Sequence, residues 1–239
     1  MKDEAERADV NKGGEANVGR ATDSSFILDP SSFRRTILVF AKYPEPGRVK
    51  TRLAATVGKE RAAAMYRGWV AEVLAALQPL RGRTRLVCSF DGAPRASFSD
   101  WEGLVDDWWP QPQGDLGERL AAGFRWGLTG GGPVVAVGTD CLELDAALVG
   151  EAFDLLAAGR DAVFGPTPDG GYYLVGMSAE LPGLFAGVRW SDPDTLTDHL
   201  SRCRERGWSY ALLPARHDID TWDDWAAYLD RAAGTGSDR

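Results

Sequence analysis

The stretch TILVFAKYPEPGRVKTRL, residues 36–53, decides what kind of fold to expect from this sequence. It begins with the apolar run TILVF, which is typical of a strand covered on both faces of a sheet. A loop with two prolines and Gly47 follows, and then Arg48, Lys50 and Arg52 occupy alternate positions. Two interpretations stay open at this point. The loop is either a solvated basic turn or a cradle for phosphates, in which glycine permits close backbone approach and the cations donate charge-assisted hydrogen bonds.

The composition limits the class of protein. The chain has 239 residues, of which 44% are hydrophobic, so one main domain with a core of ordinary size is expected. The net charge of −8 predicts no general attraction to nucleic acid or to an anionic membrane, so an anionic substrate needs local cations or a metal ion. The acidic start MKDEAERAD favours a cytosolic protein. Cysteines far apart in the sequence predict buried or free thiols at Cys88, Cys141 and Cys203.

The sequence divides into a polar leader and one folded region. Residues 1–34 are rich in glycine, serine, asparagine and charge, so we expect a flexible leader, a domain over 35–232 and a flexible tail over 233–239. Short apolar runs predict strands over 36–41, 85–90, 133–138, 161–166, 172–177 and 208–214. Periodicity predicts helices over 59–78, 115–128 and 145–158, one that is capped by Ser191 or Asp192, starts at Pro193 and ends at Gly207, and a last one from Thr221.

Continuously apolar strands that alternate with helices indicate an α/β fold, in which a mostly parallel sheet is covered on both faces. Ligands of such sheets bind beyond the carboxyl ends of the strands. This rule selects the segments that follow strands, which span 41–53, 138–144, 165–174 and 217–221. The familiar phosphate-binding patterns G-x-x-x-x-G-K-[ST] and G-x-G-x-x-G do not follow any of the expected strands, which argues against a P-loop enzyme or a dinucleotide-dependent dehydrogenase.

Acidic residues follow two of the strands. Asp140 comes directly after an apolar strand, where a carboxylate suits Mg²⁺, since this ion takes one or two protein carboxylates together with substrate phosphates. The alternative is that Asp140 or Asp145 caps the next helix. Asp218 and Asp220 follow the last strand and are expected to face the same crevice. For Asp220 a second interpretation, a cap of the final helix, is equally open.

Residues 165–174, GPTPDGGYYL, combine a strand end with two glycines. Gly170, Gly171 and Tyr172 suit close approach of a hydroxyl-bearing acceptor, and Asp169 is available there as a base or as an orienting hydrogen-bond acceptor. An ordinary D-G hairpin turn explains the same residues.

The loop QPQGDLGERL leads into an expected helix. Its two acids, Asp115 and Glu118, complement the helix dipole, which is a sufficient structural explanation for them. Gln113 and the backbone around Gly114 and Gly117 are in addition candidates for reading the edge of a nucleobase.

Taken in order, these strings resemble the DUF2064 family, also called rSAM-selenodomain-associated transferase 1, whose members are found beside radical-SAM genes and often labelled arsenosugar-type glycosyltransferases. The resemblance covers residues 36–229 and rests on AKYPEPGRVKTRL, QGDLGERL, GTDCLEL, GPTPDGGYYLVGM, WS and DIDT. It implies the GT-A fold of nucleotide-diphospho-sugar transferases, a three-layer sandwich with a mostly parallel central sheet, which nucleotidyltransferases share.

The resemblance also implies the residues of three sites. Nucleotide contacts are expected from Ala41, Lys42, Gly47, Arg48, Lys50, Arg52, Gln113, Gly117, Thr139 and Asp140. A metal ion, Mg²⁺ or Mn²⁺, is expected at Asp140 together with Asp220 or Asp218. The acceptor is expected at Asp169, Gly170, Gly171 and Tyr172. The catalytic residues among them would be Lys50, Arg52, Asp140 and Asp169.

The leading hypothesis is a metal-dependent glycosyltransferase that takes a nucleoside diphosphate sugar and a small-molecule acceptor. Two alternatives are kept. One is a nucleotidyltransferase that moves a nucleotide from a nucleoside triphosphate to a phosphorylated small molecule and releases pyrophosphate. The other is a non-catalytic nucleotide-binding module. The sequence departs from the family pattern at Leu142 and Trp222, where the family usually has proline, and each change replaces a residue that shapes a loop or a helix start.

Overall fold

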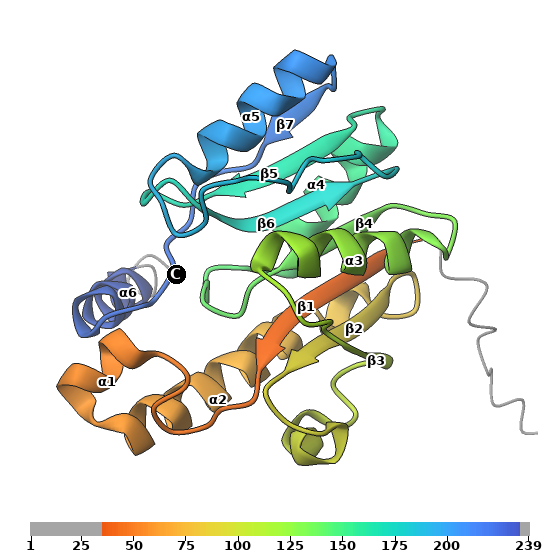
Figure 1. The fold of residues 1–239 in the computed structure, drawn as a ribbon. Helices are drawn as coiled ribbons and strands as arrows, with labels where there is room; N and C mark the ends of the chain where they lie inside the picture. The colour runs from red at the N-terminus through yellow and green to blue at the C-terminus, as the bar shows by residue number, and fades with distance from the viewer. Residues whose placement is uncertain (1–34, 235–239) are drawn as a thin grey trace, which may run out of the picture.

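The computed structural model describes residues 35–234, so the expected leader and most of the expected tail lie outside the described residues and the domain boundaries stay a prediction. The strands are β1 (Thr36–Lys42), β2 (Arg85–Asp91), β3 (Asp107–Pro110), β4 (Val134–Val137), β5 (Ala162–Pro166), β6 (Tyr172–Met177) and β7 (Tyr210–Leu212) (Figure 1). The helices are α1 (Thr51–Val57), α2 (Lys59–Ala76), α3 (Leu116–Leu128), α4 (Ala146–Ala157), α5 (Thr195–Arg206) and α6 (Trp222–Gly234), with short 3₁₀ helices η2 (Gln78–Leu80) and η3 (Arg95–Trp101).

The strands form one 7-stranded sheet in the order β3-β2-β1-β4-β6-β5-β7. Strand β1 pairs in parallel with β2 and β4, β2 with β3, and β5 with β7, whereas β6 lies antiparallel between β4 and β5. The predicted α/β fold with a mostly parallel sheet is thus confirmed. Because every strand except β6 runs in one direction, the carboxyl ends of β1, β4, β5 and β7 meet at the same edge.

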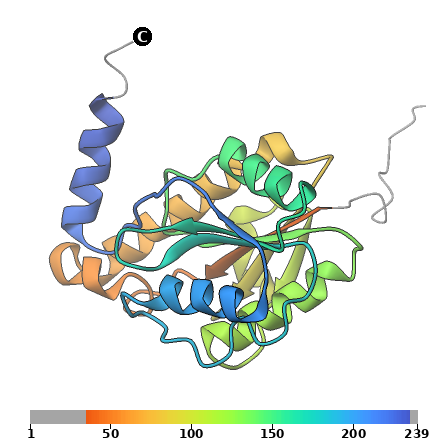
Figure 2. The same ribbon diagram turned by 90° about the horizontal axis from the view of Figure 1, so that it is seen from above.

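Helices cover both faces of the sheet (Figures 1 and 2). On one face, Ile37 and Val39 of β1 pack in a core with side chains of α2 and α4. On the other face, Leu38 packs in a second core with side chains of α3 and α5. The run TILVF is apolar at successive positions because alternate side chains enter these two cores.

Several elements differ from the sequence-based expectation. Helix α1 was not predicted, because its seven residues are too short for a clear helical periodicity and directly follow a loop with two prolines and a glycine. Strand β3 was not predicted, since its four residues DWWP include a charge and a proline. Helix α5 begins at Thr195 rather than at Pro193, and its N-cap is Asp194 rather than Ser191 or Asp192. The Asp192 carboxylate instead accepts from the Asp194 N–H at 2.9 Å, just before the helix. Its predicted end at Gly207, in left-handed conformation, is confirmed.

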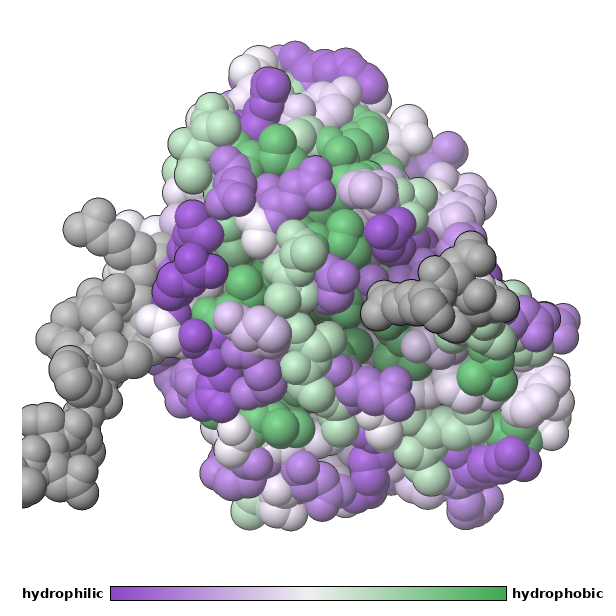
Figure 3. Space-filling view, turned by 180° about the vertical axis from the view of Figure 1, so that it is seen from behind, coloured by the Kyte–Doolittle hydropathy of each residue, from purple (hydrophilic) through white to green (hydrophobic). Residues whose placement is uncertain are grey.

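The surface mixes polar and apolar side chains, and Figure 3 shows hydrophobic areas broken up by hydrophilic ones. Within the described part of the chain, the exposed large hydrophobic residues are scattered over α3, β7 and α6, at Leu116, Leu212 and Leu229. Between residues 35 and 234 no helix has both the length and the hydrophobicity that are needed to cross a membrane. All three cysteines are buried free thiols, as predicted.

Close packing between β5 and β6 yields a stability prediction. A Cβ atom added at Gly165 would lie 2.3 Å from the ring of Tyr173, whose hydroxyl donates a hydrogen bond to the Pro214 carbonyl at 3.0 Å. Gly165→Ala should therefore lower the free energy of unfolding by about 1–3 kcal/mol, as overpacked core substitutions do. Chemical denaturation followed by circular dichroism measures this change.

The matched control is Gly68→Ala, at an exposed position inside α2 where an added Cβ meets nothing within 4 Å. It should raise stability by about 0.5–1 kcal/mol, because alanine is the better helix former. Equal stabilities of the two variants would contradict the packing of Tyr173 on Gly165.

Candidate functional site

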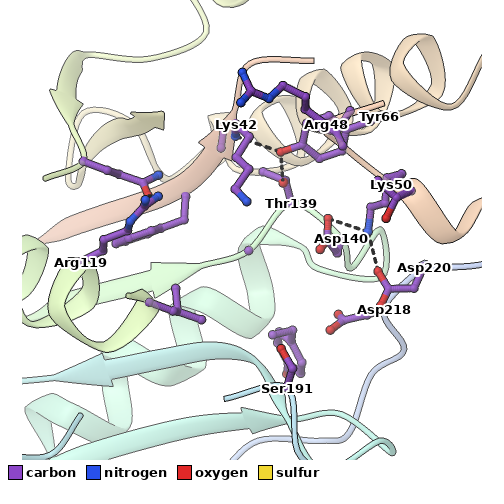
Figure 4. Close-up of a pocket in the computed structure, with 18 of the residues that line it drawn as sticks. Lys42, Arg48, Lys50, Tyr66, Arg119, Thr139, Asp140, Ser191, Asp218 and Asp220 are labelled. Carbon is purple, nitrogen blue, oxygen red and sulfur yellow. Dashed lines mark hydrogen bonds and ion pairs between the residues drawn. The ribbon is translucent and has the colours of Figure 1, made fainter. Parts of the chain in front are cut away.

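A cavity of about 680 Å³, here called the large cavity, opens at the carboxyl ends of β1 and β4 (Figure 4). Its volume falls within the range of about 300–1,000 Å³ that is common for small-molecule sites. The residues that line it come from every segment selected by the strand-end rule, from the loop before α3, from α2 and α3, and from the segment before α5. They are Phe40, Ala41, Lys42, Arg48, Val49, Lys50, Thr51, Arg52, Tyr66, Gln111, Gly114, Leu116, Arg119, Gly138, Thr139, Asp140, Tyr172, Tyr173, Ser191, Asp218 and Asp220.

The loop after β1 reaches the cavity through a tight turn. The Arg48 N–H donates to the Glu45 carbonyl at 3.0 Å, and Gly47 has a φ of 81°, which is the left-handed conformation that a type II turn requires at this position. Gly47 does not line the cavity, so its part in the site is to shape the loop. After the turn, Lys50 also adopts a left-handed conformation, with a φ of 44°, and helix α1 begins at the next residue.

The ammonium group of Lys50 joins three segments of the chain. Its Nζ atom lies 2.9 Å from an oxygen of Asp140, 2.9 Å from an oxygen of Asp220 and 2.6 Å from the carbonyl oxygen of Ile219. The side chain of Lys50 is only 5% exposed. Burial alone would lower the pKa of Lys50, but the attraction of Asp140 and Asp220 outweighs burial and raises the pKa above its ordinary value. Lys50 is therefore a permanent positive charge in the wall of the cavity.

Asp220 is held by two cations rather than used as a helix cap. Besides Lys50, the Arg52 guanidinium lies 3.2 Å from Asp220. Helix α6 is capped by Thr221, whose hydroxyl accepts from the Asp224 N–H at 3.2 Å, while the Asp224 carboxylate accepts from the Thr221 N–H at 2.8 Å. The capping interpretation of Asp220 is thus wrong.

For Asp145 the structural interpretation is confirmed, because its carboxylate accepts from the Leu148 N–H at 2.8 Å and caps α4. The acids Asp115 and Glu118 likewise form a capping box at the start of α3. Neither Asp145 nor Asp115 lines the large cavity.

Asp218 is a carboxylate without a hydrogen-bond partner in residues 35–234, and it faces the cavity beside Asp140 and Asp220 (Figure 4). Burial is the largest of the effects that together raise the pKa of Asp218 to about 7; the charges of Asp140, Asp169 and Asp220 add to it, and the Lys50 ammonium only partly offsets them. Negative charge therefore gathers around Asp218, while the lining of the large cavity as a whole also holds the cations Lys42, Arg48, Lys50, Arg52 and Arg119.

Tyr66 of α2 braces the floor of the site, a role that no sequence pattern revealed because it lies on the apolar face of its helix. The Lys42 N–H donates to the Tyr66 hydroxyl at 3.1 Å, and the same hydroxyl lies 3.0 Å from the Thr139 hydroxyl. These contacts fix the ends of β1 and β4 relative to each other. The Lys42 side chain points into the cavity, and its Nζ atom has no hydrogen-bond or ion-pair partner within the described residues (Figure 4).

The loop before α3 reaches the cavity with only one of the residues expected, Gly114. The structure does not bring Gln113 or Gly117 to the cavity, which Gln111 and Arg119 line instead. The Arg119 guanidinium lies 2.6 Å from Asp91 and 3.3 Å from the Gln111 side-chain oxygen. An added Cβ at Gly117 would lie 2.6 Å from the Phe185 carbonyl, so that glycine serves close packing of α3.

A second, smaller cavity of about 220 Å³ adjoins the large one. The two share Arg52, Asp218 and Asp220, and the small cavity continues between the loop after β5 and helix α6. Asp169 lines this small cavity, and one of its oxygens accepts from the Thr167 hydroxyl at 2.5 Å.

Of the other expected acceptor residues, Tyr172 lines the large cavity, while Gly170 and Gly171 line neither. A Cβ at Gly170 would lie 1.8 Å from the Pro193 carbonyl, and the Leu196 N–H donates to the Gly170 carbonyl at 2.9 Å. The glycine permits close approach of the protein's own backbone rather than of a ligand.

Backbone strain is concentrated at the large cavity. Within residues 35–234, the non-glycine residues with positive φ are Lys50 and Ser191, at 44° and 58°. Both line the large cavity, and Ser191 was not among the expected site residues. Such conformations are costly and tend to occur at functional sites.

The two departures from the family pattern lie beside the acids. Leu142 and Trp222 are half-buried, and both pack against the core that contains α2 and α4. In this chain apolar packing therefore takes the place of a rigid proline at both positions. Leu142 is two residues after Asp140, and Trp222 is two residues after Asp220.

Comparison with solved structures places the fold among transferases. A protein of Desulfovibrio desulfuricans G20, which carries a provisional assignment as a nucleotide-diphospho-sugar transferase, is 33% identical, with a TM-score of 0.76 over 86% of this chain and 90% of that chain. A 4-diphosphocytidyl-2C-methyl-D-erythritol synthase of Anaerococcus prevotii DSM 20548 has a TM-score of 0.56 at 10% identity, over 84% of this chain and 100% of the other.

A third similar structure contains a metal ion. Glucosyl-3-phosphoglycerate synthase of Mycobacterium tuberculosis, in complex with Mn²⁺, UDP and glucosyl-3-phosphoglycerate, has a TM-score of 0.50 at 12% identity, over 84% of this chain and 77% of the other. At such identities the likeness shows the fold alone. No curated protein matches the sequence.

The family model described as an uncharacterized protein conserved in bacteria, DUF2064, matches residues 73–192. The predicted resemblance is confirmed by this match and by the D. desulfuricans structure. The chain belongs to the DUF2064 family, within the fold of the nucleotide-diphospho-sugar transferases.

Proposed function

We propose that this protein is a glycosyltransferase that binds a nucleoside diphosphate sugar in the large cavity and transfers the sugar to a small-molecule acceptor. The observation that carries the proposal is the position of Lys50, Arg52 and Lys42 around a cavity of about 680 Å³. The relative of 33% identity, with its provisional assignment as a nucleotide-diphospho-sugar transferase, supports it. The buried free thiols are consistent with action in the reducing cytosol.

The chemistry requires stabilisation of a leaving diphosphate. When the bond between the anomeric carbon and the diphosphate oxygen breaks, negative charge grows on that oxygen. Lys50 is held in place before any ligand arrives, so its charge acts without reorganisation. Lys42 adds a positive charge to the cavity wall, and Arg52 lies there paired with Asp220. Arg48 lines the large cavity as well, at the exposed side of the loop and 3.3 Å from Glu45.

The residues present fit a hard divalent cation, Mg²⁺ or Mn²⁺. Residues 35–234 contain no group of three or more side chains that could hold a metal ion by themselves. Magnesium, however, commonly takes one or two protein carboxylates and completes its shell with phosphate oxygens and water. Asp140 and Asp218 offer such a pair, since the Asp218 carboxylate has no hydrogen bond within residues 35–234 and Asp140 is paired with one cation, Lys50, whereas Asp220 is paired with two. The ion would supply further neutralisation of the diphosphate.

Nucleotidyl transfer is the alternative that the shared fold with cytidylyltransferases keeps open. The two reactions differ in product, because glycosyl transfer releases a nucleoside diphosphate and nucleotidyl transfer releases pyrophosphate. Incubation with UDP-, GDP-, ADP- or CDP-glucose and candidate acceptors should release the nucleoside diphosphate, whereas incubation of the same acceptors with nucleoside triphosphates should give no product. Pyrophosphate would select the alternative, and tight nucleotide binding without turnover would select a binding module.

Removal of the Lys42 side chain tests the phosphate site. Lys42→Ala should weaken binding of the tightest of these nucleoside diphosphates about tenfold or more, because a charge-assisted hydrogen bond is lost. Binding of the corresponding nucleoside should not change, since it has no phosphate. Isothermal titration calorimetry measures both affinities. Arg83→Ala removes one exposed charge at the other end of the sheet and serves as the control. Equal losses in the two variants would contradict a phosphate site at Lys42.

Asp218→Asn tests the charge imbalance. The pKa of Asp218 is raised to about 7 by burial and by neighbouring carboxylates, against about 4 in the unfolded chain. The folded state thus binds the extra proton, and the stability from this proton is full below pH 4 and lost as the pH rises through 7. Asparagine never ionises, so the stability of the variant relative to the wild type should increase as the pH rises.

The expected gain in unfolding free energy is about 2 kcal/mol at pH 8, since solvent screening roughly halves the 4 kcal/mol that such a shift represents. Thermal unfolding of both proteins at pH 4.5 and pH 8 measures it. Addition of about 10 mM Mg²⁺ at pH 8 should raise the stability of the wild type but not that of the variant. A pH-independent difference between the two proteins would contradict the excess of negative charge at Asp218.

A further inference from the structure

The small cavity is placed to hold a molecule that reacts with the occupant of the large one. It shares Arg52, Asp218 and Asp220 with the large cavity, so a ligand in either one contacts the same three side chains. Its remaining walls are the loop after β5 with Thr167, Pro168 and Asp169, the segment between β7 and α6 with His217, and one face of α6 with Asp224, Ala227 and Arg231. At about 220 Å³ it has room for roughly seven water molecules of about 30 Å³ each, which corresponds to a small compound.

In the small cavity the arginines are paired with carboxylates, whereas some carboxylate oxygens remain open to a ligand. Both arginines are already engaged by carboxylates, Arg52 by Asp220 at 3.2 Å and Arg231 by Glu143 at 2.8 Å. The Asp218 carboxylate, in contrast, has no hydrogen bond within residues 35–234. Asp169 uses only its Oδ1 atom, which accepts from the Thr167 hydroxyl and the Gly171 N–H. The walls therefore offer carboxylate oxygens that can accept hydrogen bonds from a ligand, while the charge of both arginines is already balanced by acidic side chains.

We propose that the small cavity is the acceptor site and that the acceptor is a neutral or cationic hydroxyl compound, such as a polyol, a monosaccharide or an amino sugar, rather than a phosphorylated one. This inference rests on the proposed function. A phosphate in the small cavity would face Asp169 and Asp218 without an unengaged cation, and like charges at such range cost several kcal/mol. A donor diphosphate in the large cavity adds negative charge, which a divalent ion balances only in part.

The reaction balances with these residues. The acceptor hydroxyl oxygen forms a bond to the anomeric carbon of the donor sugar, and the bond from that carbon to the diphosphate oxygen breaks. The diphosphate leaves with the electron pair, and the hydroxyl proton passes to the free oxygen of Asp169, which Thr167 and Gly171 hold in position. Nucleotidyl transfer to a phosphorylated acceptor would need the opposite charge in this cavity.

Three probes with one ring and different charge test the acceptor class: D-glucose, D-glucosamine and D-glucose 6-phosphate. Saturation-transfer NMR titrations measure their affinities for the full chain, alone and with the tightest nucleoside diphosphate and Mg²⁺. Glucose and glucosamine should bind at least tenfold more tightly than glucose 6-phosphate. Asp169→Asn should narrow this difference several-fold, while Asp223→Asn, an exposed change on α6 outside the cavity, should not.

A pair of matched variants tests the location. Ala227→Leu places bulk in the small cavity and should abolish binding of glucose and glucosamine, whereas Ala233→Leu, at an exposed position of the same helix, should leave it unchanged. Nucleotide affinity should be the same in both variants. Tighter binding of glucose 6-phosphate, no binding of any probe, or equal effects of the two leucines would overturn the inference. Failure of nucleotides to bind the wild type would instead refute the proposed function. The two failures can be told apart, because the titrations without nucleotide measure binding to the small cavity alone.

Discussion

The site depends on one buried ammonium group. Lys50 is 5% exposed, and a charge in that position is tolerated only because Asp140, Asp220 and the Ile219 carbonyl surround it. These partners come from the end of β4 and from the segment before α6, so a single electrostatic requirement aligns three strand ends. The parallel sheet makes this possible, since its strands deliver their last residues to one edge. Tyr66 adds a second tie between the ends of β1 and β4.

In the same region, carboxylates lie close together around Asp218. The carboxylates Asp140, Asp218 and Asp220 lie side by side in the wall of the large cavity, and that of Asp218 has no hydrogen-bond partner within residues 35–234. Such an arrangement costs stability in the free protein, and it is relieved by ligands that bring positive charge or hydrogen-bond donors. Because Asp218 borders both cavities, it is positioned to respond to whatever occupies either one.

The positions of most strands and of the segments around Lys50 could be predicted from the sequence, because apolar runs mark the strands and the parallel topology brings their ends together. The apolar runs located β1, β2, β4, β5 and β6 closely, and the rule that ligands bind at strand ends selected the segments that meet at Lys50. The prediction that basic and acidic side chains far apart in sequence would meet is confirmed by the distances to Asp140 and Asp220. Their roles in binding and catalysis stay proposals.

The remaining details depend on three-dimensional packing that one sequence does not encode locally. Gly170 was expected to admit a ligand, but the atom that approaches it is the Pro193 carbonyl, which lies over twenty residues away. The loop before α3 was correctly placed near the cavity, yet Gln111, directly after β3, lines the cavity and Gln113 does not. Ser191 was expected only as a helix cap, and its place in the cavity wall was missed because a positive backbone angle at a serine has no sequence signal.

The contact between Lys50 and Asp220, which are 170 positions apart, has a consequence for protein synthesis. The ribosome releases β1 and the loop after it early, and the carboxylate that completes the surroundings of Lys50 only after nearly the whole domain has emerged. A nascent or prematurely terminated polypeptide thus carries a half-neutralised ammonium and no finished pocket. Occupancy by ligand is in this way restricted to molecules whose translation has been completed through Asp220.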